Sequence, residues 1–127
     1  MECYFGSHDL PSDDNIMDKN VVVSFHIPEV GIKFKAPFAA VDPDHGDLAA
    51  LLALLEFIDS NQKYFPHCTF QIFGNNLKVV DGLNQKMELP EKFHHLIKKA
   101  LNYREKYRFS LGWTPSEGNP DFEALFD

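Results

Sequence analysis

The chain has 127 residues, of which 44% are hydrophobic, so it is long enough for one domain with a substantial core and too apolar to be disordered throughout. Its formal net charge of −7 argues against a surface that binds nucleic acid tightly and without regard to sequence. No apolar run reaches the roughly 20 residues of a membrane span, and no charged-then-apolar leader opens the chain, so we expect neither a membrane protein nor a signal peptide.

The first third of the chain predicts three strands. Glu2–Phe5 is a short strand candidate, and residues 6–20 follow as a polar, acidic loop that is expected to be mobile. Val21–Ile27 is a run of β-branched and aromatic residues typical of a strand. In Gly31–Ala36 apolar residues alternate with two lysines, so this segment is expected to pair back on the preceding strand as a hairpin.

The next element is a helix that is apolar on nearly every side. Asp44 is positioned to cap it, Asp47 stands three residues later like the acidic member of a capping box, and the helix runs to about Ser60. Between Asp47 and Ser60 only Glu56 and Asp59 are polar. Such a helix is either central in the fold or buries its outer face against a partner, which would be a second copy of the chain or another protein.

The stretch Thr69–Asn84 predicts a strand that turns directly into a helix. Thr69–Phe73 alternates and is rich in β-branched and aromatic residues, and Leu77–Leu83 has apolar residues at helical spacing. Asn75 or Asn76 can cap that helix with its side-chain oxygen. A strand that ends in polar residues presents them at the carboxyl edge of the sheet, where open α/β sheets usually place their chemistry.

The remaining residues predict a long helix, a strand and a short terminal helix. Pro90 is suited to the first position of the long helix. Arg108–Trp113 is the last strand candidate, and Asn119–Phe126 is the terminal helix.

The charges are distributed unevenly along the chain. Residues 1–60 hold 11 acidic residues and 3 Lys or Arg, whereas residues 86–108 hold 7 Lys or Arg and 3 acidic residues. A solvated amphipathic helix is the simpler interpretation of the basic stretch. If it contacts phosphate groups, Lys98, Lys99 and Arg104 are the strongest candidates.

The two cysteines are expected to be buried, reduced thiols, which indicates a reducing compartment. Cys3 and Cys68 both lie in or beside expected strands, and neither belongs to a close Cys/His pair that would bind metal. Buried, reduced thiols are typical of a cytoplasmic protein.

The order of elements, together with five short motifs, resembles the ribonuclease H-like superfamily over nearly the whole chain. The motifs are Tyr4–Ser7 at a strand end, Gly46–Leu51 at a helix start, Gly74–Asn76 after the fourth strand, Phe109–Pro115 late in the chain and Asn119–Leu125 at its end. The resemblance implies an α/β fold in one domain, with a mixed five-stranded sheet and helices on both faces.

The same resemblance implies a site. Ribonucleases H cut the RNA strand of RNA–DNA hybrids with two Mg²⁺ ions, which several carboxylates must hold together. The positions that match the family's four ligands are Phe5, Asp47, Asn75 and Glu123. Because two of the four anionic ligands are missing, we expect an inactive site without a cofactor, in a module that acts in binding or assembly.

Two alternatives stay open. A metal-dependent nuclease could use a rearranged set, namely Asp47, Glu123 and a loop acid such as Asp9, with Mg²⁺ or Mn²⁺. The simpler interpretation is that the loop acids are solvated, that Asp47 stabilises the helix dipole and that Glu123 is an exposed acid. The second alternative is nucleic-acid binding without cleavage through residues 86–108.

Overall fold

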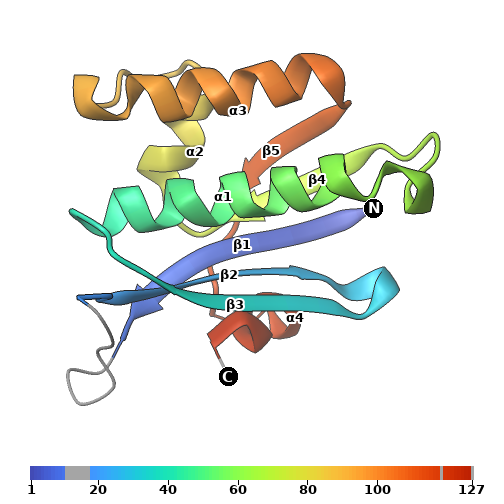
Figure 1. Ribbon diagram of the computed structural model, residues 1–127, viewed down its shortest axis with the longest axis horizontal. Helices are drawn as coiled ribbons and strands as arrows, with labels where there is room; N and C mark the ends of the chain where they lie inside the picture. The colour runs from blue at the N-terminus through green and yellow to red at the C-terminus, as the bar shows by residue number, and fades with distance from the viewer. Residues whose placement is uncertain (11–17, 118, 127) are drawn as a thin grey trace.

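The computed structural model describes residues 1–10, 18–117 and 119–126, and these build one five-stranded sheet with helices on both sides (Figure 1). The strands are β1 (Glu2–Asp9), β2 (Val21–Ile27), β3 (Ile32–Phe38), β4 (Phe70–Gly74) and β5 (Phe109–Trp113). The helices are α1 (Pro43–Ser60), α2 (Leu77–Leu83), α3 (His94–Lys106) and α4 (Pro120–Glu123), with short 3-10 turns η2 (Pro28–Val30), η3 (Gln62–Tyr64), η4 (Glu91–Phe93) and η5 (Ala124–Phe126).

The sheet is mixed, as the sequence predicts. Its strand order is β3-β2-β1-β4-β5. The strands β1, β2 and β3 are antiparallel neighbours, whereas β4 runs parallel to both β1 and β5. The hairpin of β2 and β3 is confirmed, and Gly31 ends its turn in the left-handed conformation, at φ 67°, that glycine adopts without strain.

The first strand is longer than its sequence predicts. The prediction of a loop from residue 6 is wrong for Gly6–Asp9, which continue β1 and pair with β2 from Gly6 opposite Ser24 to Asp9 opposite Val21. The residues from Gly6 to Asp9 have weak strand propensity, so the pairing partner rather than the local sequence imposes the extended conformation. The central part of the expected loop, residues 11–17, lies outside the described residues.

Helix α1 is the central helix of the fold. Its buried residues include Leu48, Leu51 and Leu55, and it packs on β1 and β2 on one side and beside α3 on another. The first of the two predicted explanations for its apolar composition is therefore confirmed. Although α1 is rich in leucine, no helix in the described part of the chain is long and apolar enough to cross a bilayer.

The cap of α1 differs from the prediction. Asp42, not Asp44, is the N-cap, and its Oδ1 accepts a hydrogen bond from the backbone N–H of His45 at 3.0 Å. Pro43 then occupies the first helical position, where a missing N–H costs nothing. The helix thus begins earlier than expected, and Asp47 lies in its second turn, where it is buried rather than capping.

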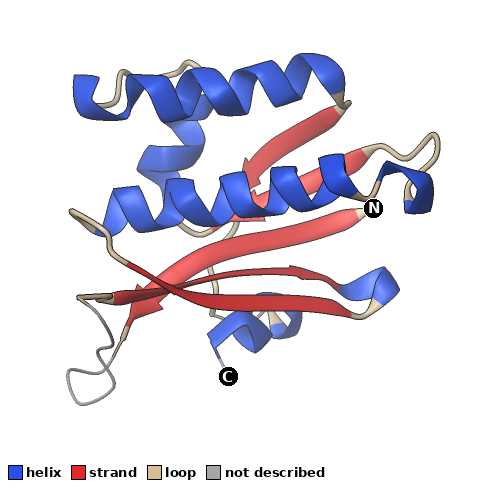
Figure 2. Ribbon diagram, in the orientation of Figure 1, coloured by secondary structure: helices blue, strands red, loops and turns tan. Residues whose placement is uncertain are grey.

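The opposite face of the sheet carries the C-terminal helix, which Figure 2 shows on the other side from α1 and α3. Phe122 and Leu125 form a second small core with Tyr4 and Phe73. The ring of Tyr4 lies 5.6 Å from that of Phe73 and 5.7 Å from that of Phe122. Helices on both faces are therefore confirmed.

The start of α3 is also shifted. Pro90 is extended (φ −52°, ψ 145°) and therefore lies outside the helical region, so it precedes the helix rather than opening it. A 3-10 turn at Glu91–Phe93 follows, and α3 begins at His94.

Candidate functional site

The candidate site lies at the carboxyl ends of β1 and β4, where α1 and α2 begin. Phe5 of β1 stands opposite Gly74 of β4 in the parallel register. Ser7 follows two residues after Phe5, and Asn75 and Asn76 follow Gly74 directly. The start of α1 brings Asp47 to the same place, since its carboxylate contacts both Ser7 and Asn76.

The first position that the family resemblance singled out is filled by an aromatic ring. Phe5 is only 1% exposed. A Cβ atom placed on Gly74 would lie 2.6 Å from Cζ of Phe5, so the ring rests directly against the Gly74 backbone. This point of the sheet edge is therefore part of the apolar core and offers no ligand oxygen from the side chain.

Asp47 is a buried residue at the centre of a partly buried hydrogen-bond network. Its side chain is 7% exposed. Its Oδ1 accepts from the backbone N–H of Ser7 at 3.0 Å and from the Ser7 hydroxyl at 2.8 Å, and its Oδ2 accepts from Nδ2 of Asn76 at 2.8 Å. Burial raises the pKa of Asp47, while the hydrogen bonds from Asn76 and Ser7 oppose that rise.

Asn76 uses its whole amide group. Its Nδ2 donates to Asp47 and also to Oδ1 of Asp44 at 2.9 Å, while its Oδ1 caps α2 by accepting from the Val79 N–H at 3.2 Å. Asp44 in turn pairs with Lys78 at 2.8 Å. We refer to Ser7, Asp44, Asp47, Asn76 and Lys78 as the edge network, because they join β1, α1 and α2 at the sheet edge.

The absence of a side chain at Gly46 allows α1 to approach Ser7 of β1 closely. A Cβ atom at this position would lie 2.7 Å from Oγ of Ser7. The close approach of α1 to the end of β1 therefore depends on a glycine beside Asp47. This contact explains why the Ser7 hydroxyl reaches the Asp47 carboxylate at hydrogen-bond distance.

Asn75 and Asn76 have different hydrogen-bond partners in the structure. Asn75, which sequence matching placed in the site, has its carbonyl oxygen bonded to Nε1 of Trp113 at 3.0 Å. Its neighbour Asn76 is the residue that contacts Asp47. The sequence contained a signal for Asn76, because either asparagine could cap α2, but it contained none for the role of Ser7.

Glu123 and Asp9 lie elsewhere. Glu123 is exposed on α4, next to the buried Phe122, and Asp9 is exposed at the last position of β1, opposite Val21. Across residues 1–10, 18–117 and 119–126, no three His, Cys, Asp or Glu side chains gather in a way that could hold a metal ion. The structure therefore does not bring Asp47, Glu123 and Asp9 together as one such group.

The edge network does not fit the Mg²⁺ ions that the family resemblance implies. Mg²⁺ requires hard anionic oxygens in near-octahedral geometry. Here Phe5 supplies a buried ring, and both oxygens of Asp47 accept hydrogen bonds from N–H or O–H donors of Ser7 and Asn76. Three of the roughly four acceptor positions of the Asp47 carboxylate are therefore taken by donors.

Three of the seven Lys and Arg residues in the basic stretch 86–108 form ion pairs within the chain. Three ion pairs link it to the acidic half: Lys92 to Asp42 at 2.7 Å, Lys99 to Glu56 at 2.8 Å and Lys106 to Asp59 at 2.7 Å.

Two of the residues named as phosphate contacts therefore have other partners. Lys99 is one member of an ion pair, and Arg104 donates to the Leu83 carbonyl at 3.3 Å and lies over the ring of Phe109. Lys98 is exposed. A role for these three residues in nucleic-acid contact stays a prediction.

Comparison with known proteins identifies the fold. No protein-family profile and no curated protein matches the sequence. Among solved structures, the chain is similar to ribonuclease H1 from the halophilic archaeon Halobacterium salinarum NRC-1, with a TM-score of 0.73, 14% identity, and 98% of this chain and 92% of that chain covered.

Two structures of a second enzyme agree with this likeness. LC11-RNase H1 in complex with an RNA/DNA hybrid gives a TM-score of 0.72 at 11% identity, covering 98% of this chain and 91% of that chain. LC11-RNase H1, isolated from compost by a metagenomic approach, gives 0.75 at 10% identity, with 98% and 90% covered. The chain therefore has the ribonuclease H-like fold, as its motifs suggested.

Proposed function

We propose that this chain is a catalytically inactive ribonuclease H-like module that works by binding or assembly in the cytoplasm. The observation that carries the proposal is the edge network, in which three donor groups occupy the oxygens of Asp47 beside the buried ring of Phe5. Cleavage with two metal ions needs carboxylates that are free to coordinate. The unpaired thiols of Cys3 and Cys68 are consistent with a reducing compartment.

The surface beside α1 supports a role in assembly. Ala49, Ala53 and Phe57 of α1 are half-buried, and Phe34 of β3 is exposed. The rings of Phe34 and Phe57 lie 5.0 and 5.4 Å from that of Phe25, so they form one apolar surface over a shared buried ring. Such a surface is suited to a protein partner, including a second copy of the chain.

The experiment is a cleavage assay on a labelled RNA–DNA hybrid with Mg²⁺ or Mn²⁺, paired with calorimetric titration of each metal. We expect no cleavage and no saturable metal binding, while a ribonuclease H1 run in parallel cuts the hybrid. Asp47→Ala serves as the matched variant. Cleavage by the natural chain that disappears in a folded Asp47→Ala variant would support the alternative, a nuclease with a rearranged metal site around Asp47, Glu123 and Asp9.

Anisotropy measurements on the same labelled hybrid test binding without cleavage. If the basic stretch holds phosphates, the affinity falls steeply with salt and falls further in Lys98→Gln and Lys99→Gln. We expect no such binding, because ion pairs within the chain already occupy Lys92, Lys99 and Lys106.

A further inference from the structure

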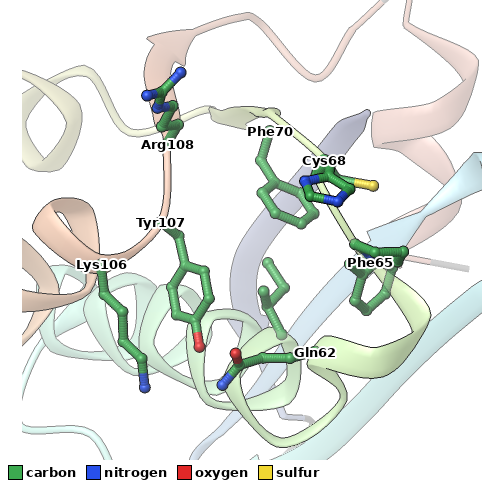
Figure 3. A pocket seen from close by; sticks show the side chains of 10 residues that line it. Gln62, Phe65, Cys68, Phe70, Lys106, Tyr107 and Arg108 are labelled. Atoms are coloured by element: carbon green, nitrogen blue, oxygen red, sulfur yellow. The ribbon is translucent and has the colours of Figure 1, made fainter.

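A hollow of about 270 Å³ lies at the other end of the sheet from the edge network, where β4 and β5 begin (Figure 3). It lies between the last turns of α1, the segment 65–68 and the junction of α3 with β5. We call it the amino-edge pocket. Its lining residues are Ile58, Gln62, Phe65, Pro66, His67, Cys68, Phe70, Lys106, Tyr107 and Arg108.

The inner wall of the amino-edge pocket is apolar and aromatic. Ile58, Phe65 and Phe70 are buried, and the rings of Phe65 and Phe70 meet edge to face with centroids 5.7 Å apart. Figure 3 shows Tyr107 and Phe65 on opposite sides of the hollow, with the side-chain amide of Gln62 turned toward Tyr107. This wall is suited to a flat aromatic ring, because ring pairs in offset or edge-to-face arrangements are favourable.

The rim of the pocket carries two basic side chains, those of Lys106 and Arg108. Lys106, Arg108 and His67 line it, and its lining includes no carboxylate. Asp59 lies next to the pocket, where Lys106 at 2.7 Å and the hydroxyl of Tyr107 hold it, and this pairing cancels the charge of Lys106. Arg108 is exposed and forms no ion pair with the described residues, so it leaves one unbalanced positive charge.

This charge pattern sets the pocket apart from the hollows beside α2 and α3. The chain as a whole has a net charge of −7. The hollows beside α2 and α3 include the carboxylates of Glu88, Glu91 or Glu105 in their linings. The segment that closes the amino-edge pocket also holds His67 in the left-handed conformation, at φ 60°, which is uncommon for a non-glycine residue.

We propose that the amino-edge pocket binds a small organic anion built on one aromatic ring, of which an aromatic carboxylate is the simplest example. The ring packs against Phe65, Phe70 and Tyr107. The carboxylate meets the guanidinium of Arg108, a lining residue whose side chain is turned away from the rings in Figure 3 and must swing over the rim. The volume is below that of sites for drug-sized molecules, which favours a ligand of one ring. A planar guanidinium is the side chain best suited to a carboxylate. The proposal does not depend on whether the chain cleaves nucleic acid.

The test is an NMR titration of the full chain, labelled with ¹⁵N, with benzoate as the probe and benzamide as its neutral counterpart. We expect saturable shifts of the backbone amides of residues 62, 65, 67–70 and 106–108, larger and tighter for benzoate than for benzamide. Arg108→Gln should weaken benzoate binding roughly tenfold, because it removes a charge-assisted hydrogen bond. Lys98→Gln, which removes an exposed cation from α3, should leave the affinity unchanged.

A second pair of variants distinguishes binding inside the pocket from general attraction to positive charge. Gln62→Phe places a ring in the mouth of the pocket and should abolish the shifts, whereas Asn102→Phe adds the same ring on exposed α3 and should not. The proposal is overturned if benzoate produces no saturable shifts at millimolar concentrations, or if Arg108→Gln binds as tightly as the natural chain. Shifts spread over the lysines of α3 would equally overturn it, because they would indicate general charge attraction.

Discussion

Two polar regions hold α1 in place, and they differ in their exposure to water. The edge network surrounds Asp47, which is 7% exposed, at the start of the helix. The α1–α3 seam, formed by Glu56, Asp59, Lys99 and Lys106, lies on the surface, and the side chains of Lys99 and Glu56 are both 52% exposed. The contact distances in the two regions are similar, at 2.7 to 3.0 Å, so distance alone does not separate them.

The two regions differ instead in their access to water. A buried donor that loses its acceptor has no solvent to replace it, so the loss costs the full desolvation of that donor. An exposed ion pair exchanges its partner for water and salt ions with little change in free energy. The edge network should therefore govern stability, while the α1–α3 seam should chiefly set how the surface charges are arranged.

Removing the carboxylate of Asp47 should produce the larger effect. In Asp47→Ala the N–H and hydroxyl of Ser7 and one N–H of Asn76 lose their acceptor in a partly buried region. We expect the free energy of unfolding to fall by about 2–3 kcal/mol. Urea denaturation measures this change.

A matched variant controls for the general effect of an Asp→Ala substitution. Asp81 lies on α2, and its carboxylate makes no hydrogen bond or ion pair to the described residues, so Asp81→Ala should change stability by less than about 0.5 kcal/mol. Equal losses in the two variants would remove the distinction between the buried and exposed regions.

The pH dependence should have opposite signs in the two regions. Burial raises the pKa of Asp47 above its ordinary 3.8, so the folded state takes up a proton before the unfolded state does. As the pH falls toward 3.8, the natural chain should therefore gain stability relative to Asp47→Asn. The hydrogen bond from Lys106, with one from Tyr107, lowers the pKa of Asp59, so its contribution is present above 3.8 and is lost as the pH falls below it.

Urea denaturation of the natural chain, Asp47→Asn and Asp59→Asn between about pH 7 and pH 3 measures both trends. The stability difference from Asp47→Asn should shift in favour of the natural chain as the pH falls, and the difference from Asp59→Asn should shift against it. The same slope for both variants would mean that the two carboxylates share one environment.

The smallest effect should come from the exposed pair of Lys99 and Glu56. A double-mutant cycle with Lys99→Gln and Glu56→Gln should give a coupling free energy of about 0.5 kcal/mol or less, which shrinks as salt is added. A coupling above about 2 kcal/mol that persists in salt would show that this pair behaves like the buried network.

Most of the fold follows from local patterns in the sequence. The β-branched and aromatic run in β2, the alternation in β3, the leucine-rich α1 and the strand-to-helix turn at Asn76 are all signalled by residues that lie close together along the chain. The prediction failed where distant partners decide the conformation. Gly6–Asp9 are extended because β2 pairs with them. The α1 cap is a different kind of error, because Asp42 and Pro43 carry a local signal that the prediction overlooked: proline is suited to the first helical position.

The candidate site was less predictable for the same reason. Matching of motifs found Asp47, but the environment of its carboxylate depends on Ser7, 40 residues away, and on Asn76, 29 residues away. The pairing of the basic stretch with acids of α1 was also invisible, because it requires the packing of two helices that a strand and a third helix separate in sequence. The ion pairs of Lys99 and Lys106 thus offset only part of the uneven charge distribution along the chain.

The contact between Phe5 and Gly74 makes these two positions depend on one another in evolution. A side chain larger than hydrogen at position 74 would collide with the Phe5 ring, with a Cβ atom only 2.6 Å from it. An aspartate introduced at position 5 would in turn leave a void over Gly74 and place an unpaired charge in the core. A single substitution at position 5 or at position 74 should therefore destabilise the fold, so we expect these two positions to change together rather than one at a time.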